Sequence, residues 1–393
     1  MSNAPRIYLD HAATSPLRPE ARAVREACAD VADANPASAH GFGRAALDVL
    51  ERARQGLADL LEAPRDGILF TSGGTASDNL AVLGFSRAHA GQRPLVVVSA
   101  VEHKAVLGAA RRAAAEGAEL VVLPVGPDGA VDPVDLEHAL DGADDRPALV
   151  SVMWANNEIG TVQPVADLCR IARARGARFH TDAVQAFGKI PVSLAEVPAD
   201  LLTVTAHKIG GPVGIGLLAR REDVPLEPLC YGGTQENGLW PGTQDAAAAA
   251  AFAEAARLAV AERPDAAARW PRLREALAAE LRDGIEGLVV HAEGAAARLP
   301  HLLSVGVPGV DSATLLVALD MAGVAVSSGS ACGSGSSSGS HVLAALGRER
   351  SGPYAVIRFS FGPATTSEEV RRAAATTVRA AARARSAGSA SPA

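Results

Sequence analysis

Short apolar segments alternate with helical segments over the first two thirds of the chain. The expected strands cover residues 67–71, 95–99, 120–124, 148–153, 178–185 and 201–205. Strands that alternate with helices in this way form a mainly parallel sheet with helices packed on it. Polar side chains cluster where several of these strands end, and an open α/β sheet builds its binding site along that edge. The pattern therefore predicts an α/β fold with a site at the carboxyl ends of its strands.

The length of the chain and a change in its sequence pattern after residue 244 indicate how many domains it has and where they divide. The chain has 393 residues, too many for one small core, so about two domains are expected. A long alanine-rich helix is expected from Gln244, a further helical segment at 272–283, and a domain boundary near Ala261. We expect a large domain at 16–260, a small domain made of 1–15 and 261–385, and a disordered tail at 386–393.

The net charge and the composition of the N-terminal residues argue against several classes of protein. The formal net charge is −7 and the pI is near 5.8, which argues against a nucleic-acid-binding surface. Residues 1–6 lack the apolar core of a signal peptide, and no apolar run is long enough to span a bilayer. The cysteines form no CxxC pair and no disulfide framework. We therefore expect a cytoplasmic protein without a membrane partner or a direct nucleic-acid partner.

The stretch 203–212 combines a strand end with a lysine and a glycine turn. Residues 201–204 form a short apolar run, and Thr205, His207 and Lys208 follow it before a Gly-Gly-Pro turn. A lysine at the end of a buried strand stands where a parallel sheet places its chemistry. Burying its amine costs desolvation free energy, so lysines in such positions tend to be functional. The alternative is an ordinary surface lysine in a loop.

Residues 67–79 have the pattern of a strand, a glycine turn and a helix. Backbone N–H groups converge at such a helix start, where the helix dipole favours an anion. Gly73 and Gly74 permit the close approach of a phosphate, and Thr75 adds a hydroxyl donor. The glycine spacing matches neither a Walker A motif nor GxGxxG. Many strand-to-helix turns carry glycines without binding a ligand, so this pattern is weak by itself.

Further polar residues follow the other strands, namely His103, Asn156, Asp182 and Gln185. One cofactor needs such a set together with a lysine and a phosphate turn. Pyridoxal phosphate requires a lysine for its Schiff base, an acid that keeps its ring nitrogen protonated, and donors for its phosphate and ring oxygen. Asp182 can supply the acid, and Gln185 can reach the ring oxygen. Taken singly, Asp182 could instead cap a helix or join a buried salt bridge, and His103 could be a polar residue at a helix start. No metal site is expected.

Cys332 lies in a Gly/Ser-rich loop, residues 327–340, that carries no side chain large enough to pack. An accessible, mobile thiol is a candidate nucleophile or redox group, and a tolerated loop cysteine is the alternative. The other cysteines are expected to be structural. Arg358 lies on an expected strand at 355–361 and could hold a substrate carboxylate through two parallel hydrogen bonds.

Ten stretches, in order along the chain, resemble the motifs of one enzyme family. They are YLDHAATSP, NPASAHGFG, FTSGGTASDN, EHKAV, NNEIGTVQP, HTDAVQAFGK, AHKIGGPVGIG, SSGSACGS, SHVLAALG and IRFSFGP. The sequence resembles the cysteine desulfurases of the NifS/IscS type, within the class V aminotransferase family of fold-type I pyridoxal phosphate enzymes. The resemblance covers about residues 8–382. It implies a large domain with a mainly parallel seven-stranded sheet that binds the cofactor, and a smaller α+β C-terminal domain that carries the Cys332 loop.

The resemblance also implies roles for individual residues. The implied catalytic residues are Cys332, Lys208 and His103, and the implied substrate-binding residues are Asn156 and Arg358. The implied pyridoxal phosphate contacts are Gly74, Thr75, His103, Asn156, Asp182, Gln185, Thr205, His207, Lys208 and Thr243. Thr243 would reach the phosphate bound by a neighbouring subunit, which implies a homodimer with shared sites.

The activity implied by the resemblance is sulfur transfer from L-cysteine. The products would be L-alanine and a persulfide on Cys332, and an acceptor protein that docks near the Cys332 loop would take the sulfur. Iron–sulfur cluster assembly is the default pathway by resemblance. Two alternatives stay open: another pyridoxal phosphate reaction, such as a C–S or C–Se lyase or an aminotransferase, and a non-catalytic scaffold. Asn237 and Trp240 stand where the family commonly carries arginine.

Overall fold

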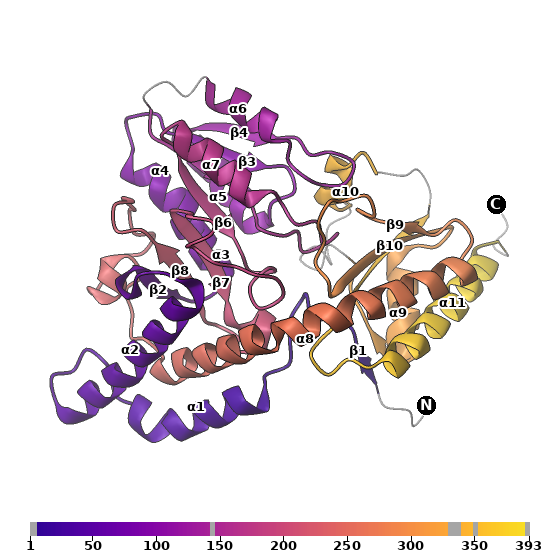
Figure 1. The fold of residues 1–393 in the computed structure, drawn as a ribbon, viewed down its shortest axis with the longest axis horizontal. Helices are drawn as coiled ribbons and strands as arrows, with labels where there is room; N and C mark the ends of the chain where they lie inside the picture. The colour runs from indigo at the N-terminus through magenta and orange to yellow at the C-terminus, as the bar shows by residue number, and fades with distance from the viewer. Residues whose placement is uncertain (1–5, 142–145, 329–338, 349–352, 390–393) are drawn as a thin grey trace.

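The structure is a computed structural model that describes residues 6–141, 146–328, 339–348 and 353–389. In Figure 1 a large sheet flanked by helices lies beside a smaller sheet, and the long helix α8 (Ala246–Gly284) runs along both. Cys332 lies outside the described residues.

Within the described chain, the large sheet holds seven strands in the order β2-β8-β7-β6-β5-β3-β4. They are β2 (Ile68–Thr71), β3 (Leu95–Ser99), β4 (Glu119–Leu123), β5 (Ala148–Ser151), β6 (Arg178–Asp182), β7 (Leu201–Thr205) and β8 (Gly216–Arg220). Strands β4, β3, β5, β6 and β7 pair in parallel, whereas β8 is antiparallel to both β7 and β2. The expected α/β fold with a mainly parallel sheet is confirmed.

Helices cover both faces of this sheet. They are α1 (Pro19–Ala32), α2 (Gly41–Leu61), α3 (Gly74–Asn79), α4 (Phe85–Ala88), α5 (Lys104–Ala115), α6 (Pro133–Asp141) and α7 (Val165–Ala174), and a π-helical turn at Leu80–Gly84 joins α3 to α4. Alternate residues of one strand enter different cores: Leu95 and Val97 belong to one hydrophobic cluster, and Val96 and Val98 to another. Because both of its faces are buried, a central strand such as β3 is a continuous apolar run rather than an alternating one.

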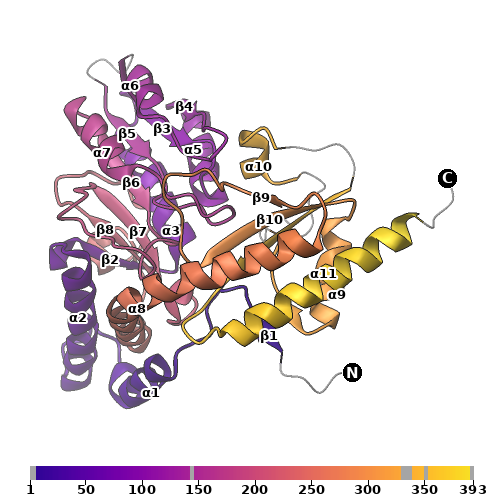
Figure 2. The ribbon, with the colours of Figure 1, turned by 45° about the vertical axis from the view of Figure 1, so that its right-hand side comes forward.

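The smaller part contains a three-stranded antiparallel sheet and further helices. The sheet has the order β12 (Tyr354–Ser360), β10 (Leu302–Pro308) and β9 (Val289–Val290), and β1 (Ile7–Tyr8) pairs in parallel with β11 (Val324–Ala325). Helices α9 (Ser312–Met321), α10 (His341–Ala345) and α11 (Ser367–Ser389) complete this part. Figure 2 shows α8 and α11 lying side by side below the small sheet.

Helix α8 corrects one expectation. The sequence predicted a long helix from Gln244 and a further helical segment at 272–283, whereas α8 is one helix from Ala246 to Gly284 with Pro264 and Pro271 inside it. Each proline removes one backbone hydrogen bond, and apolar packing on both sides holds the helix together. Ala259 belongs to the core of the large sheet and Ala266 to the core of the small sheet. These cores support the proposal of a domain boundary near Ala261.

The end of the chain corrects another expectation. Helix α11 extends to Ser389. The prediction of a disordered tail from Ser386 is therefore wrong for residues 386–389. Residues 390–393 lie outside the described part of the chain.

A buried ion pair fixes the loop before α8 against the sheet. Arg54 on α2 donates two hydrogen bonds to the Glu236 carboxylate, at 2.7 and 2.9 Å, and the backbone N–H of Phe70 donates a third at 2.9 Å. Glu236 has a φ of 48°, a left-handed conformation that costs free energy for a residue with a side chain. The ion pair and the hydrogen bond from Phe70 hold this conformation in place.

Replacing Glu236 by alanine should destabilise the fold strongly. The change leaves the buried Arg54 guanidinium with only the partly exposed Glu51 as an anionic partner, a loss of up to about 3–5 kcal/mol. Urea unfolding should show a lower midpoint for Glu236→Ala. The matched control is Glu368→Ala, which removes an exposed ion pair with Arg371 and should cost less than about 1 kcal/mol. Equal midpoints for the two variants would contradict the structural role of the Arg54–Glu236 pair.

Candidate active site

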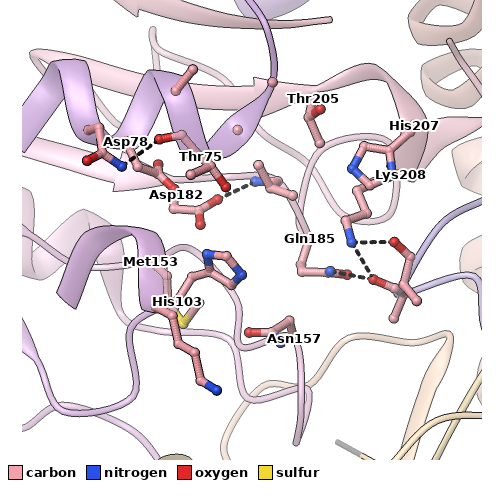
Figure 3. A pocket seen from close by; sticks show the side chains of 18 of the residues that line it. Thr75, Asp78, His103, Met153, Asn157, Asp182, Gln185, Thr205, His207 and Lys208 are labelled. Carbon is pink, nitrogen blue, oxygen red and sulfur yellow. Dashed lines mark hydrogen bonds between the residues drawn. The ribbon is translucent and has the colours of Figure 1, made fainter. Parts of the chain in front are cut away.

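A cavity of about 790 Å³ opens at the carboxyl ends of the parallel strands. It is shown in Figure 3 with side chains from β6, β7, α3 and the start of α5 around it. Lys208, Asp182, His103 and Thr75 line this cavity together. Strand ends and helix starts meet here because the parallel strands all terminate at the same edge of the sheet.

Lys208 lies on a short 3₁₀ turn, Ala206–Ile209, directly after β7. Its Nζ donates hydrogen bonds to the backbone oxygens of Ala12 at 2.8 Å and Ala13 at 2.6 Å, drawn in Figure 3. The alternative of an ordinary surface lysine does not fit this position, because the amine points into the cavity wall and the N-terminal segment holds it there. A lysine amine placed in this way can bind an aldehyde cofactor.

Asp182 is the last residue of β6, and its side chain is buried beside the cavity. One carboxyl oxygen accepts a hydrogen bond from the backbone N–H of Val184 at 2.9 Å. Burial raises the pKa of Asp182, and the neighbouring His103, the bond from Val184 and the charge of Lys208 act against that rise. A buried carboxylate in this place can hold a protonated ring nitrogen of a bound ligand.

The glycine turn before α3 forms another wall of the cavity. Gly73 has a φ of +144°, and a Cβ on Gly74 would come within 3.0 Å of Val184 Cγ2. The turn thus needs glycine for its backbone and for the space beside it. Thr75, Thr205 and His207 also line the cavity. This wall can bind a phosphate through N–H and hydroxyl donors.

His207 and His103 differ in their surroundings. Burial lowers the pKa of His207 to about 4, with a further contribution from the charge of Lys208, and His207 Nδ1 lies 3.0 Å from the Thr14 hydroxyl. His103 caps α5, where its Nδ1 accepts the N–H of Ala105 at 3.2 Å, and its ring borders the cavity. His103 therefore lies where it can face a planar ligand.

Of the predicted cofactor contacts Gln185 and Asn156, only Gln185 lies at the cavity. Gln185 lines the cavity and donates to the Ala12 oxygen at 2.9 Å. Asn156 does not reach the cavity: it is fully buried, donates to Val101 O and accepts the N–H groups of Glu158 and Ile159. Its amide organises the loop, so its predicted place at the cofactor and substrate is wrong.

The neighbouring Asn157 lines the cavity instead of Asn156. Either residue of the pair could have turned inward as far as the sequence shows. Only one of them can take the hydrogen bonds that close the loop after β5.

The remaining predicted residues fall at different distances from the cavity. Arg358 on β12 lines it although it is 1% exposed, and donates to Asn157 O at 2.7 Å and to Asp10 Oδ1 at 3.0 Å. Thr243 is exposed and does not line the cavity of its own chain. Trp240, from the same loop, does line it.

Three acidic residues in or behind the cavity wall were not predicted from sequence. Asp78 on α3 and Glu158 line the cavity, and Glu102 lies directly before His103. All three side chains are almost fully buried. The sequence offered one signal for Asp78, its spacing of three residues from Thr75, which places the two on one face of a helix.

A family model described as aminotransferase class-V matches residues 7–373. The chain belongs to this family. It is 39% identical over 364 residues to the cysteine desulfurase IscS of Dictyoglomus turgidum, with 93% of this chain and 91% of that protein covered. Among solved structures, a NifS-like protein aligns with a TM-score of 0.88 at 33% identity over 95% of this chain and 98% of the other. SspA in complex with cysteine aligns with a TM-score of 0.77 at 27% identity over 92% of this chain and 100% of the other.

These similarities identify the activity of this class-V family member. The chain functions as a pyridoxal-phosphate-dependent cysteine desulfurase, an enzyme that removes sulfur from cysteine. The cavity fits this cofactor: an amine, a buried carboxyl and a glycine turn surround one space. The glycine turn opens helix α3 at the cavity wall, and the backbone N–H groups of a helix start suit a phosphate.

The unfolding free energy of this desulfurase should depend on pH through Glu102. Burial raises the pKa of Glu102 to about 8 from 4.5, so its contribution is complete below about pH 4.5 and is lost as the pH rises through about 8. Glu102→Gln cannot ionise. The wild-type protein should therefore lose a few kcal/mol relative to Glu102→Gln between those values.

Thermal unfolding of the cofactor-loaded proteins across this pH range measures that difference. Glu368→Gln, at an exposed position, serves as the control and should follow the wild type. Parallel curves for wild type and Glu102→Gln would show that Glu102 does not take up a proton in the folded protein.

Proposed function

We propose that this desulfurase transfers the sulfur of L-cysteine to Cys332 as a persulfide and then to an acceptor protein. The observation that carries the proposal is the convergence of Lys208, Asp182, His103 and Arg358 on one cavity, although they come from distant parts of the chain. Amine, acid, base and carboxylate-binding groups thus surround the same space.

Residues of the large sheet would hold the cofactor. Lys208 supplies the amine, Asp182 the ring-nitrogen partner, and Gln185 a contact on the ring-oxygen side. The phosphate would lie against Gly74, Thr75, Thr205 and His207. Bound pyridoxal phosphate supplies an electron sink that eases loss of the substrate's α-proton. His103 borders the same space, which supports a role in which it would stack on the ring and carry a proton.

Arg358 is the proposed partner of the substrate carboxylate. Its guanidinium lies against the cavity, and its Nε is buried without a hydrogen-bond partner among the described residues. Its bond to Asp10 neutralises part of its charge until a carboxylate arrives. A second carboxylate can bind an arginine through its remaining N–H groups. The related SspA structure, which contains cysteine, supports an amino acid of this size.

Sulfur transfer would use the Cys332 thiolate as nucleophile. The thiolate attacks the substrate sulfur, forming an S–S bond while the Cβ–S bond breaks. The electron pair of the broken bond stays with the substrate carbon, which takes up a proton and leaves as L-alanine. Cys332 is left as a persulfide, whose outer sulfur an acceptor thiol can remove.

The proposed partners extend beyond the single chain. The exposed Thr243 would reach the phosphate in the other half of a homodimer. An acceptor protein would dock near the Cys332 loop, and iron–sulfur cluster assembly is the proposed pathway, in the cytoplasm. Among the described helices, none has both the length and the hydropathy for a membrane crossing.

Replacing Cys332 by alanine tests the persulfide route. With L-cysteine, pyridoxal phosphate and a reductant present, Cys332→Ala should form alanine at least about 100-fold more slowly than wild type, because the nucleophile is gone. Cys230→Ala removes an exposed thiol outside the cavity lining and should keep its rate. If Cys332→Ala still forms alanine and sulfide at the wild-type rate, sulfur leaves without Cys332 and a lyase mechanism replaces this proposal.

A further inference from the structure

Asp78 is a buried carboxyl in the cavity wall that no step of the proposed reaction uses. It lies on α3, borders the same cavity as Asp182, and is 1% exposed. Figure 3 shows the two residues beside each other on one wall. The charge of Asp182 acts on Asp78, so the two groups form one electrostatic site. Two ionised carboxylates in such a buried site repel each other, and a shared or retained proton removes the repulsion.

A chain of hydrogen bonds fixes one side of Asp78. The Thr203 hydroxyl donates to the Asp78 carboxyl. Because that hydroxyl has one hydrogen, Thr203 Oγ1 accepts the Nε2–H of His180, at 3.1 Å. His180 Nδ1 then accepts from the Ser151 hydroxyl at 2.8 Å. Burial lowers the pKa of His180 to about 3, so its ring is neutral. Each hydrogen bond of the series therefore keeps the donor and acceptor given above.

The Oδ1 atom of Asp78 lies outside that chain. It is buried and has no hydrogen-bond partner among the described residues. His180 Nε2 is 3.8 Å from it, too far for a hydrogen bond. A buried carboxylate oxygen without a donor is costly, whereas a carboxylic acid O–H is itself a donor.

The titratable groups that act on Asp78 are themselves acids. Burial raises the pKa of Asp78, and Asp182 from β6 and Glu102 from the start of α5 act in the same direction. The hydrogen bond from Thr203 acts in the other direction. A proton on Asp78 would therefore have two effects. It would turn Oδ1, which has no partner among the described residues, into a hydrogen-bond donor, and it would remove the repulsion between two carboxylates.

We propose that Asp78 is a positioning residue that stays a carboxylic acid and donates a hydrogen bond from Oδ1 to Asp182. This bond keeps Asp182 as the anion of the pair and orients it toward the ring nitrogen of the cofactor. The orientation toward the ring rests on the proposed function. The hydrogen bond between the two carboxyl groups does not.

Infrared spectroscopy of the cofactor-loaded protein near neutral pH tests the proton directly. A protonated carboxyl absorbs apart from a carboxylate, so the difference between wild type and Asp78→Asn should show the loss of one carboxylic acid signal. Glu102→Gln should remove a second acid signal, because the pKa of Glu102 is about 8. The exposed Asp59→Asn should remove none. An unchanged acid signal in Asp78→Asn would overturn the proposal.

Cofactor affinity separates a hydrogen-bonding role from a packing role. Asparagine at position 78 can still donate to Asp182 and accept from Thr203, whereas leucine of similar size can do neither. Asp78→Asn should bind pyridoxal phosphate on the order of tenfold more tightly than Asp78→Leu. Equal affinities would show that Asp78 acts through its shape alone and would overturn the proposal.

These readouts are independent of the persulfide route. Neither the acid signal nor the cofactor affinity involves Cys332, so the Cys332→Ala assay tests the proposed function separately. If Asp78→Leu does not fold, the infrared result for Asp78→Asn decides the question.

Discussion

The contact of the Lys208 amine with the backbone oxygens of Ala12 and Ala13 joins the parts of the molecule that make the site. Lys208 follows β7 of the large sheet, and the segment that carries Ala12 and Ala13 follows β1, which pairs with β11 in the smaller part. Gln185 donates to the same Ala12 oxygen. A partly buried ammonium group needs hydrogen-bond partners of this kind, so the Lys208 amine also holds the N-terminal segment against the cavity.

The electrostatics of the site follow from where the strands of the sheet end. Parallel strands bring Asp182 and Lys208 to one edge, and helix α3 adds Asp78 to the same wall. In this low-polarity setting each charge changes the pKa of its neighbours. Burial and the charge of Lys208 lower the pKa of His207, while burial raises the pKa of Asp182. A bound cofactor would therefore meet an environment with its charges already arranged.

The sequence predicted the sheet and most of the site because strand ends are visible in the order of residues. Lys208 and His103 come after apolar runs, Asp182 ends a strand whose last residues are polar, and all three line the cavity. The choice between Asn156 and Asn157 could not be predicted, because it depends on which amide closes the loop after β5. Asp78 could not be recognised as buried, because burial depends on the packing of α3 against β7. The continuity of α8 through Pro264 likewise depends on packing by two separate cores.

The central claim is that Lys208 is the amine that binds the cofactor. Borohydride reduction of the pyridoxal-phosphate-loaded protein makes that link permanent, and mass spectrometry of its peptides then locates the added mass. The account predicts the modification on Lys208, the lysine whose amine reaches the cavity wall at Ala12 and Ala13. Modification of another lysine, such as Lys104 at the cavity edge, with Lys208 unchanged would contradict it.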